Sequence, residues 1–102
     1  MFVGYQDEIA QKSFVSVRIM GKPVAVFTGD SGGLFSREMA CKHQGADLTA
    51  GHFRGSEVTC HRHGWQYDVS TGECLNRESP PLREHEVAVE DGAVFVSLFP
   101  RS

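Results

Sequence analysis

Two short boxes of cysteine and histidine limit what this chain can fold into more than any other feature. The first occupies residues 41–43 (CKH), and after sixteen intervening residues the second occupies residues 60–63 (CHRH). A glycine follows each box, at positions 45 and 64. Two loops built in this way can each present one thiolate and one imidazole to a shared point, because glycine lets the backbone come close to that point. The spacing therefore predicts a metal centre that two adjacent loops share.

Two cysteines and two histidines fit more than one kind of metal centre. Tetrahedral zinc binds such a set, but zinc fingers usually take two cysteines from one element and two histidines from another. A two-iron cluster with both cysteines on one iron and both histidines on the other requires each loop to reach both irons, which mixed boxes allow. The residues favour the iron–sulfur cluster and leave a structural zinc module, with a purely binding role, as an alternative.

The rest of the chain is typical of an all-β domain. Residues 13–20 (SFVSVRIM) alternate apolar and polar side chains, and a turn at Gly21-Lys22 joins them to residues 23–27 (PVAVF), which predicts a hairpin. A second hairpin is predicted over residues 85–98, with its turn at Asp91-Gly92. Shorter strands are expected at residues 34–39 (LFSREM), 56–60 (SEVTC) and 65–69 (WQYDV). No segment of ten or more residues shows a helical repeat, and the 11 glycines indicate many turns.

Length and composition narrow the function further. The 102 residues predict a single domain spanning residues 1–102. Apolar runs are too short for a membrane span or a signal peptide, so a cytoplasmic protein is expected. The formal net charge is -3, and no run of basic residues occurs, which disfavours nucleic acid as a partner. An acidic protein can still dock on a basic partner surface.

Several other reactive residues are predicted to be inert. The odd count of three cysteines favours metal ligation or buried thiols over disulfides, and Cys74 is expected to be a buried thiol. His52 and His85 are expected to be exposed or to have partners elsewhere. Residues 29–33 (GDSGG) match the loop around the nucleophile of trypsin-like proteases. That site needs a His and an Asp from a fold about twice this long, so a turn is predicted instead.

The motifs together resemble the Rieske [2Fe-2S] domain over nearly the whole chain. They are C-x-H, sixteen residues, C-x-x-H, then GWQYD and STGE, and a proline loop before the last hairpin. The resemblance implies an antiparallel β-sandwich or barrel with a small cluster-binding subdomain, roughly residues 39–82, made of two ligand loops and the proline loop. It implies one cluster held by Cys41, His43, Cys60 and His63, and a surrounding shell of Gly45, Gly64, Trp65, Tyr67, Pro80 and Pro81.

The resemblance also assigns a subtype. Respiratory Rieske proteins carry a disulfide and a serine near the cluster, but the matching positions here are Ala46, Arg62 and Trp65. Tyr67 stands where those proteins have a tyrosine that donates a hydrogen bond to a ligand sulfur. His61 is implied to be a bystander, since the family places its histidine three positions after the cysteine. The closest implied subtype is a soluble ferredoxin of a ring-hydroxylating dioxygenase system.

The implied role is a one-electron carrier without a catalytic site of its own. The expected partners are a flavin reductase, which gives the electron, and a terminal oxygenase, which takes it, and the carrier is expected to be a monomer. The alternative is the small subunit of an assimilatory nitrite reductase, which would form a stable complex with a large sirohaem subunit.

Overall fold

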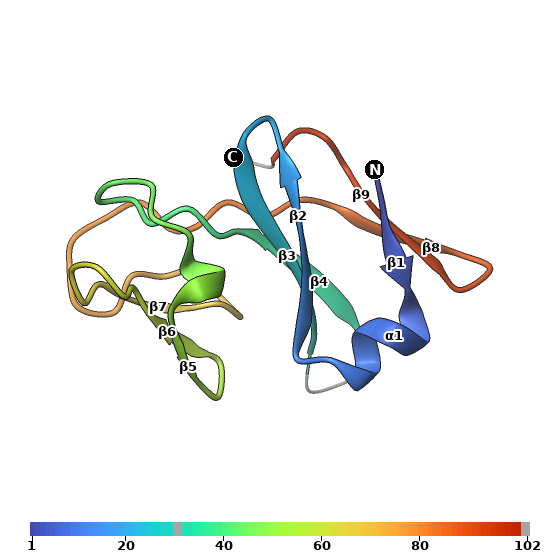
Figure 1. The fold of residues 1–102 in the computed structure, drawn as a ribbon, viewed down its shortest axis with the longest axis horizontal. Coiled ribbons are helices and arrows are strands. Elements are labelled where there is room, and N and C mark those ends of the chain that lie inside the picture. Colours follow the sequence, from blue (N-terminus) through green and yellow to red (C-terminus); the bar gives the residue numbers. More distant parts are fainter. Residues whose placement is uncertain (30–31, 101–102) are drawn as a thin grey trace.

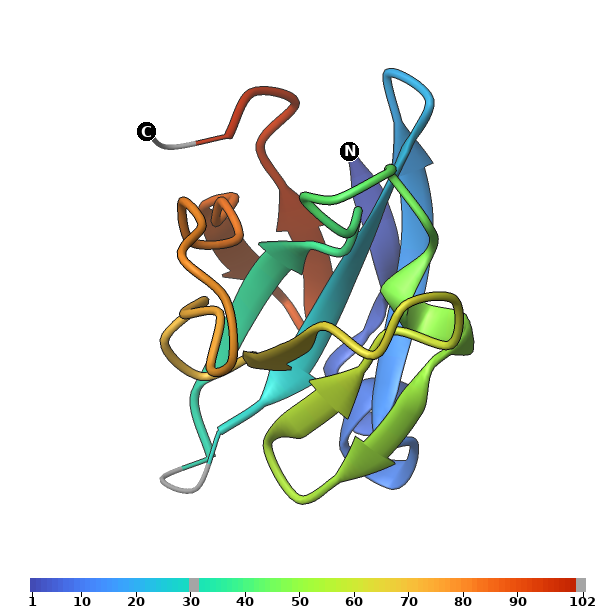
Figure 2. The same cartoon turned by 90° about the vertical axis from the view of Figure 1, so that its left-hand side faces the viewer.

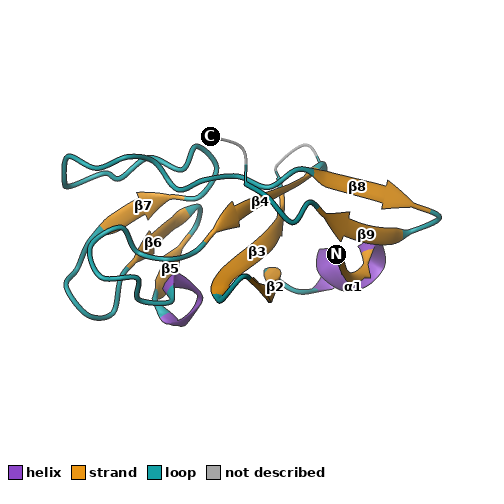
Figure 3. Cartoon of the chain, turned by 90° about the horizontal axis from the view of Figure 1, so that it is seen from above, coloured by secondary structure: helices purple, strands orange, loops and turns teal. Residues whose placement is uncertain are grey.

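The computed structural model describes residues 1–29 and 32–100, and this part of the chain is built almost entirely of short antiparallel strands (Figure 3). In chain order the elements are β1 (Phe2–Tyr5), α1 (Gln6–Gln11), β2 (Phe14–Ile19), β3 (Lys22–Thr28), β4 (Leu34–Glu38), the 3-10 helix η1 (Leu48–Ala50), β5 (His52–Arg54), β6 (Glu57–Thr59), β7 (Gln66–Asp68), β8 (Val87–Glu90) and β9 (Ala93–Val96). The all-β prediction is confirmed. Neither helical segment in the described residues is long and apolar enough to cross a membrane.

Three antiparallel sheets, each of three strands, form the described part of the molecule. Their strand orders are β1-β9-β8, β2-β3-β4 and β5-β6-β7. The β2-β3-β4 sheet lies between the other two along the long axis (Figure 1). The β5-β6-β7 sheet and the loops around it form one end of the molecule, and α1 with the β8–β9 hairpin forms the other end.

The central strand β3 has a hydrophobic core on each of its faces. Side chains alternate across a strand, so Val24 and Val26 point to one face while Ala25 and Phe27 point to the other. The valines belong to a core with Ile9 of α1 and the inner residues of β9. Ala25 and Phe27 belong to a second core, which reaches the β5-β6-β7 sheet and contains both Cys41 and Cys60. The second core thus ties the candidate ligands to the central sheet.

Both predicted hairpins are present, with one correction. The β8–β9 hairpin turns at Asp91 and Gly92, as predicted. The β2–β3 turn is formed by Met20 and Gly21, one residue earlier than the predicted Gly21-Lys22, because Lys22 already pairs with Ile19. Both turn residues have positive φ, 54° and 80°, as a two-residue turn that matches the strand twist requires.

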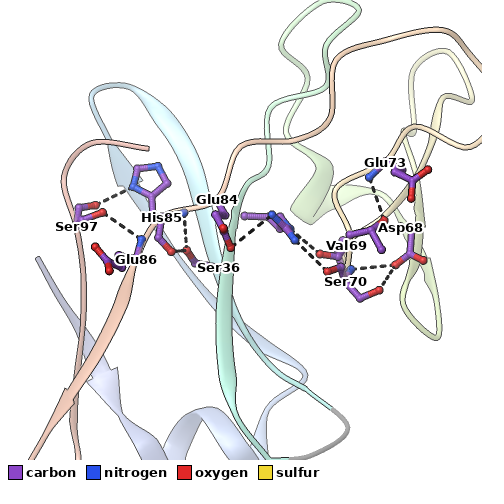
Figure 4. Close-up of polar contacts among 11 residues, drawn as sticks. Ser36, Asp68, Val69, Ser70, Glu73, Glu84, His85, Glu86 and Ser97 are labelled. Atoms are coloured by element: carbon purple, nitrogen blue, oxygen red, sulfur yellow. Dashed lines mark hydrogen bonds and ion pairs between the residues drawn. The ribbon is translucent and has the colours of Figure 1, made fainter. Parts of the chain in front are cut away.

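Buried polar contacts attach the segment before β8 to the central sheet (Figure 4). His85 is buried; its Nδ1–H donates to the Ser97 carbonyl oxygen at 2.7 Å, and its backbone N–H donates to Ser36 Oγ at 3.0 Å. His85 therefore has partners outside the metal centre, one of the two outcomes expected for it, and His52 is exposed. The turn predicted at residues 29–33 falls partly on Asp30 and Ser31, which lie outside the described residues; of its ends, the N–H of Gly29 donates to the Gly33 carbonyl oxygen.

Arg37 of β4 makes the corresponding link toward the β5-β6-β7 sheet. Its Nε donates to the Val69 carbonyl oxygen at 2.8 Å, and one terminal nitrogen donates to the Ser70 carbonyl oxygen at 2.9 Å. Its other terminal nitrogen lies 3.8 Å from a carboxylate oxygen of Glu84. Arg37 thus connects the central sheet to the turn after β7 and to the segment that leads to β8.

Candidate metal centre

The two candidate ligand loops have the same backbone hydrogen bonds. In the first ligand loop, residues 41–46, the N–H of Cys41 donates to the residue 46 carbonyl at 2.8 Å, and the N–H of Gly45 donates back to the Cys41 carbonyl at 2.7 Å. In the second ligand loop, residues 60–65, Cys60 and Gly64 make the equivalent bonds at 2.8 and 3.1 Å. Each loop is thus a closed six-residue turn that starts at a cysteine.

Glycine is needed at the fifth position of each turn. The φ angles of Gly45 and Gly64 are 71° and 73°, in the left-handed region that other residues rarely adopt. An added Cβ would find nothing within 4 Å at either position, so the need for glycine comes from the backbone angle alone. The two glycines that the sequence singled out therefore shape the loops.

The two candidate thiols are buried on the inner side of the loops. Cys41 and Cys60 are each about 3% exposed and belong to one core cluster, which includes Tyr67 and Leu82. Both are free thiols. Water is therefore kept away from the two sulfur atoms.

The two candidate imidazoles lie on the outer side. His43 and His63 are both exposed, and their rings are 4.5 Å apart, edge to face, with an angle of 88° between the planes. The Trp65 ring stacks on His43 at 5.1 Å and 20°, and the Arg77 guanidinium lies over Trp65 at 5.9 Å. One end of the molecule therefore presents the two imidazole edges to solvent.

The ring of His63 is oriented by a hydrogen bond across the two loops. Its Nε2 lies 3.1 Å from Oε1 of Gln44 in the first ligand loop. An amide oxygen can only accept, so Nε2 is the ring nitrogen that donates here. A histidine held in this way has Nδ1 available for a metal.

Tyr67 of β7 lies against the first ligand loop, where it was predicted to touch a ligand sulfur. Its hydroxyl oxygen is 3.5 Å from Cys41 Sγ and accepts from the Lys42 N–H at 3.0 Å. Burial, followed by the hydrogen bond with Cys41, raises the pKa of the Tyr67 hydroxyl above its ordinary value. The hydroxyl therefore keeps its proton and can donate it to a thiolate at Cys41.

A third segment, between β7 and β8, supports the second ligand loop. The Asn76 side chain donates to the Gly64 carbonyl at 3.0 Å and accepts from the Gln66 N–H at 2.9 Å. In Figure 2, with this end toward the viewer, the segment is drawn in gold and orange on the left, the first ligand loop in green and the second in yellow. The sequence analysis missed Asn76, because a single polar residue in a loop carries no pattern that marks it.

The proline loop combines two exposed prolines with one buried leucine. Pro80 and Pro81 are exposed, and the buried residue of this loop is Leu82, which packs in the core with both cysteines. The turn at residues 70–72 approaches Leu82 closely, since a Cβ on Gly72 would lie 2.7 Å from the Leu82 carbonyl oxygen. Leu82 was also missed, although it is the only large apolar residue between Leu75 and Val87.

Two further predictions concern residues beside the ligands. His61 is exposed, and none of the hydrogen bonds among the described residues involves its ring, which fits a bystander. Cys74 is half-buried rather than buried. It packs at the rim of the core, where its backbone forms an isolated β-bridge with Tyr67.

The donor set fits a two-iron cluster. In residues 1–29 and 32–100, no group of three or more His, Cys, Asp or Glu side chains is placed to hold a single metal ion. A Rieske-type cluster does not require one, because each iron takes two protein ligands and two bridging sulfides. The described side chains offer two such pairs, thiols that share one core cluster and imidazoles in ring contact.

Comparisons with known proteins agree with this geometry. A family model described as the Rieske [2Fe-2S] domain matches residues 1–91. The ferredoxin component of the p-cumate 2,3-dioxygenase system from Pseudomonas putida is 32% identical over 95 residues, which cover 90% of this chain and 80% of that protein. The oxidoreductase NdmD, also from Pseudomonas putida, is 32% identical over 79 residues, which cover 74% of this chain and 13% of NdmD.

A solved structure gives the same result at the level of the fold. The structure is described as a complex of reduced oxygenase and oxidized ferredoxin in carbazole 1,9a-dioxygenase. The match has a TM-score of 0.81 and 28% identity, and it covers 100% of this chain and 95% of the matched chain. The chain thus spans most of some relatives and a small part of others. It belongs to the family of Rieske [2Fe-2S] domains.

Proposed function

We propose that this chain is a one-electron carrier whose [2Fe-2S] cluster is held by Cys41 and Cys60 on one iron and by His43 and His63 on the other. The observation that carries the proposal is the pair of equivalent turns. Each turn combines one buried thiol with one exposed imidazole, at the same end of the molecule. When bound, such a cluster supplies one-electron redox chemistry, with the coordination of both irons filled.

The chain's own residues bind the cluster, orient its imidazole ligands and shield its sulfur side from water. Burial of Cys41 and Cys60 beside Leu82 excludes water from the sulfur side. Gln44 holds the ring of His63, and Trp65 stacks on His43, so both imidazoles are restrained from outside the centre. The exposed imidazole edges provide the shortest path between the buried centre and a partner protein.

The proposed partners are a flavin reductase and a terminal oxygenase. Support comes from relatives that are ferredoxin components of dioxygenase systems and from the solved complex of an oxygenase with its ferredoxin. A role without catalysis follows from the full coordination of both irons, which leaves no position for a substrate. The nitrite reductase alternative stays a prediction, and a stable complex with a sirohaem subunit, recovered from the native host at low salt, would favour it.

A pair of histidine variants tests the ligand assignment. His63→Ala should lose or change the visible spectrum of the loaded protein, because one iron loses a ligand. His61→Ala is the matched control, two positions away in the same turn and equally exposed, and it should keep the spectrum. The reverse result would show that the wrong histidine is assigned, and a colourless native protein with bound zinc would support the zinc alternative.

A further inference from the structure

The two ligand loops carry cations and no carboxylates. The first ligand loop contains Lys42, the second contains Arg62, and neither contains Asp or Glu. Arg62 is exposed and Lys42 is half-buried. The whole chain has 13 acidic residues against 10 basic ones, a net charge of -3. The sign of the charge on the ligand loops is therefore opposite to that of the protein.

Carboxylates close to the ligand loops do not reverse this sign. Asp47, just after the first ligand loop, offsets the charge of one cation, although its carboxylate is also held by hydrogen bonds from the N–H and hydroxyl of Thr49. Glu78 follows Arg77 directly, so that pair adds no net charge. Lys42 also lines a groove of about 480 Å³ together with Arg37 and Arg83 and one carboxylate, that of Glu84. The groove and the loops thus form one surface on which cations outnumber carboxylates.

The opposite end of the molecule is acidic. The first turn of α1 contains Asp7 and Glu8, and the β8–β9 turn contains Asp91, directly after Glu90. These elements lie at the far end of a molecule 40 Å long (Figure 1). Salt screens charges beyond about 8 Å at physiological ionic strength. A partner at the ligand loops is therefore exposed mainly to the local positive charge.

From this polarity we infer that the end with the ligand loops docks on an acidic patch of a protein redox partner, with Lys42 and Arg62 facing the partner's carboxylates. The inference rests on the proposed function, since it names the kind of partner that the electron carrier fits. Nucleic acid is the less suitable polyanion, because its binding needs a larger cluster of basic residues. The far end, being acidic, would be repelled by the same partner, so the polarity also orients the approach.

Small charged oxidants test directly whether the charge on the ligand-loop surface is positive. In the test, the reduced, cluster-loaded protein passes one electron to hexacyanoferrate(III), a trianion, or to hexaammineruthenium(III), a trication, and no bond or proton is exchanged. The rates are measured by stopped flow at pH 8, where free imidazoles are uncharged, from low to high salt. The trianion should react several-fold more slowly as salt rises, and the trication should not slow. The net charge of the whole protein, -3 for the polypeptide and one unit more negative with the cluster reduced, predicts the opposite signs, and that outcome would overturn the inference.

Two variants with the same change in net charge locate the effect. Arg62→Glu should abolish or reverse the salt dependence with the trianion. Lys12→Glu, beside α1 at the far end, should leave it unchanged. Neither side chain makes a hydrogen bond or ion pair within the part of the chain that the structure describes, so folding should be kept, and the visible spectrum and melting temperature check this. Equal effects of the two variants would show that net charge, and not the ligand-loop surface, controls the approach.

The class of partner is decided with competitors in the same assay. Poly-L-glutamate, at low salt, should slow the reaction of the wild type with the trianion and not that of Arg62→Glu. Single-stranded DNA that competes more strongly than poly-L-glutamate at equal charge would assign the surface to nucleic acid and overturn the acidic protein partner. A protein that reacts with both oxidants but with the wrong salt dependence contradicts only this inference. A protein that binds no cluster overturns the proposed function, and this inference falls with it.

Discussion

The two ligand loops share one set of backbone hydrogen bonds but are supported in different ways. Tyr67 supports the first ligand loop from the buried side, and its hydroxyl touches both the Lys42 N–H and the Cys41 sulfur. Asn76 supports the second ligand loop from the exposed side through backbone atoms of Gly64 and Gln66, and its Oδ1 also accepts from the Cys74 thiol at 4.0 Å. Among the described residues, no side-chain hydrogen bond reaches the sulfur of Cys60. The loops are therefore equivalent in shape and different in their contacts with the candidate ligands.

This difference separates two tasks within one site. A hydrogen bond to a ligand sulfur acts on the redox potential, because it stabilises the more negative, reduced state. A hydrogen bond to loop backbone acts only on the position and stability of the loop. We therefore expect Tyr67, at the first ligand loop, to affect the redox potential. We expect Asn76, at the second ligand loop, to affect only how firmly that loop is held.

The largest effects should follow from changing the shared turn itself. Gly45→Ala and Gly64→Ala force a Cβ into the left-handed region, which costs roughly 1–2 kcal/mol each. Both variants should lower the free energy of unfolding by that amount and weaken retention of the cluster, as followed by visible absorption on heating. Gly55→Ala, in the β5–β6 turn with φ of 62°, is the control, with similar strain and no effect on the cluster. If Gly45→Ala and Gly64→Ala differed clearly in unfolding free energy or in cluster retention, the two turns would not be equivalent.

The next effect concerns the first ligand loop alone. Tyr67→Phe leaves the Lys42 N–H without its acceptor and removes the hydroxyl from Cys41. We expect a loss of roughly 1 kcal/mol in unfolding free energy and a potential lower by tens of millivolts, measured by protein-film voltammetry. Tyr5→Phe, at an exposed tyrosine far from the site, is the matched control. An unchanged potential in folded Tyr67→Phe protein would show that the hydroxyl does not act on the sulfur.

A smaller effect is expected for the second ligand loop. Asn76→Ala removes two exposed hydrogen bonds to loop backbone and the long contact with the Cys74 thiol, and the loss in unfolding free energy should be about 0.5 kcal/mol. The potential should stay at the wild-type value. Asn76→Asp keeps the acceptor for the Gln66 N–H and loses the donor to the Gly64 carbonyl. Its retention of the cluster should therefore lie between that of the wild type and that of Asn76→Ala. A large shift of the potential in Asn76→Ala would contradict the separation of tasks.

The smallest effect is a dependence of stability on pH at the turn that leads to Asn76. The hydrogen bond from the Ser70 side chain, opposed by burial, lowers the pKa of Asp68 below its ordinary value. A carboxylate with a lowered pKa stabilises the fold above its unfolded pKa, and this contribution is lost as pH falls through the folded pKa. Urea unfolding followed by circular dichroism should therefore show that the free energy of unfolding falls less below about pH 4 in Asp68→Asn than in the wild type. Identical pH profiles would contradict this role for Asp68.

The sequence predicted features whose signals are local. Alternating side chains predicted the β2–β3 and β8–β9 hairpins, and the Cys, His and Gly residues of each ligand loop lie within six positions of one another. The strands β1 and β5 and the helix α1 were missed, because four, three and six residues are too few to show a period.

The missed contacts depend on residues far apart in the chain. Asn76 meets Gly64 across 12 positions, and Leu82 meets the cysteines only through the folded core. Gln44 next to His43 was missed for the same reason, since its partner is His63 on the other loop. Such contacts require the loops to be placed in space, which residue types and spacing do not reveal.

The central claim is that the two equivalent turns hold one two-iron cluster. Its most direct test is a count of iron, acid-labile sulfide and zinc in protein purified without air, combined with the Cys41→Ser and Cys60→Ser variants. We predict two irons and two sulfides per chain and no zinc in the wild type, with loss of both iron and sulfide in each variant. One zinc per chain without sulfide, or a full cluster in either cysteine variant, would contradict it.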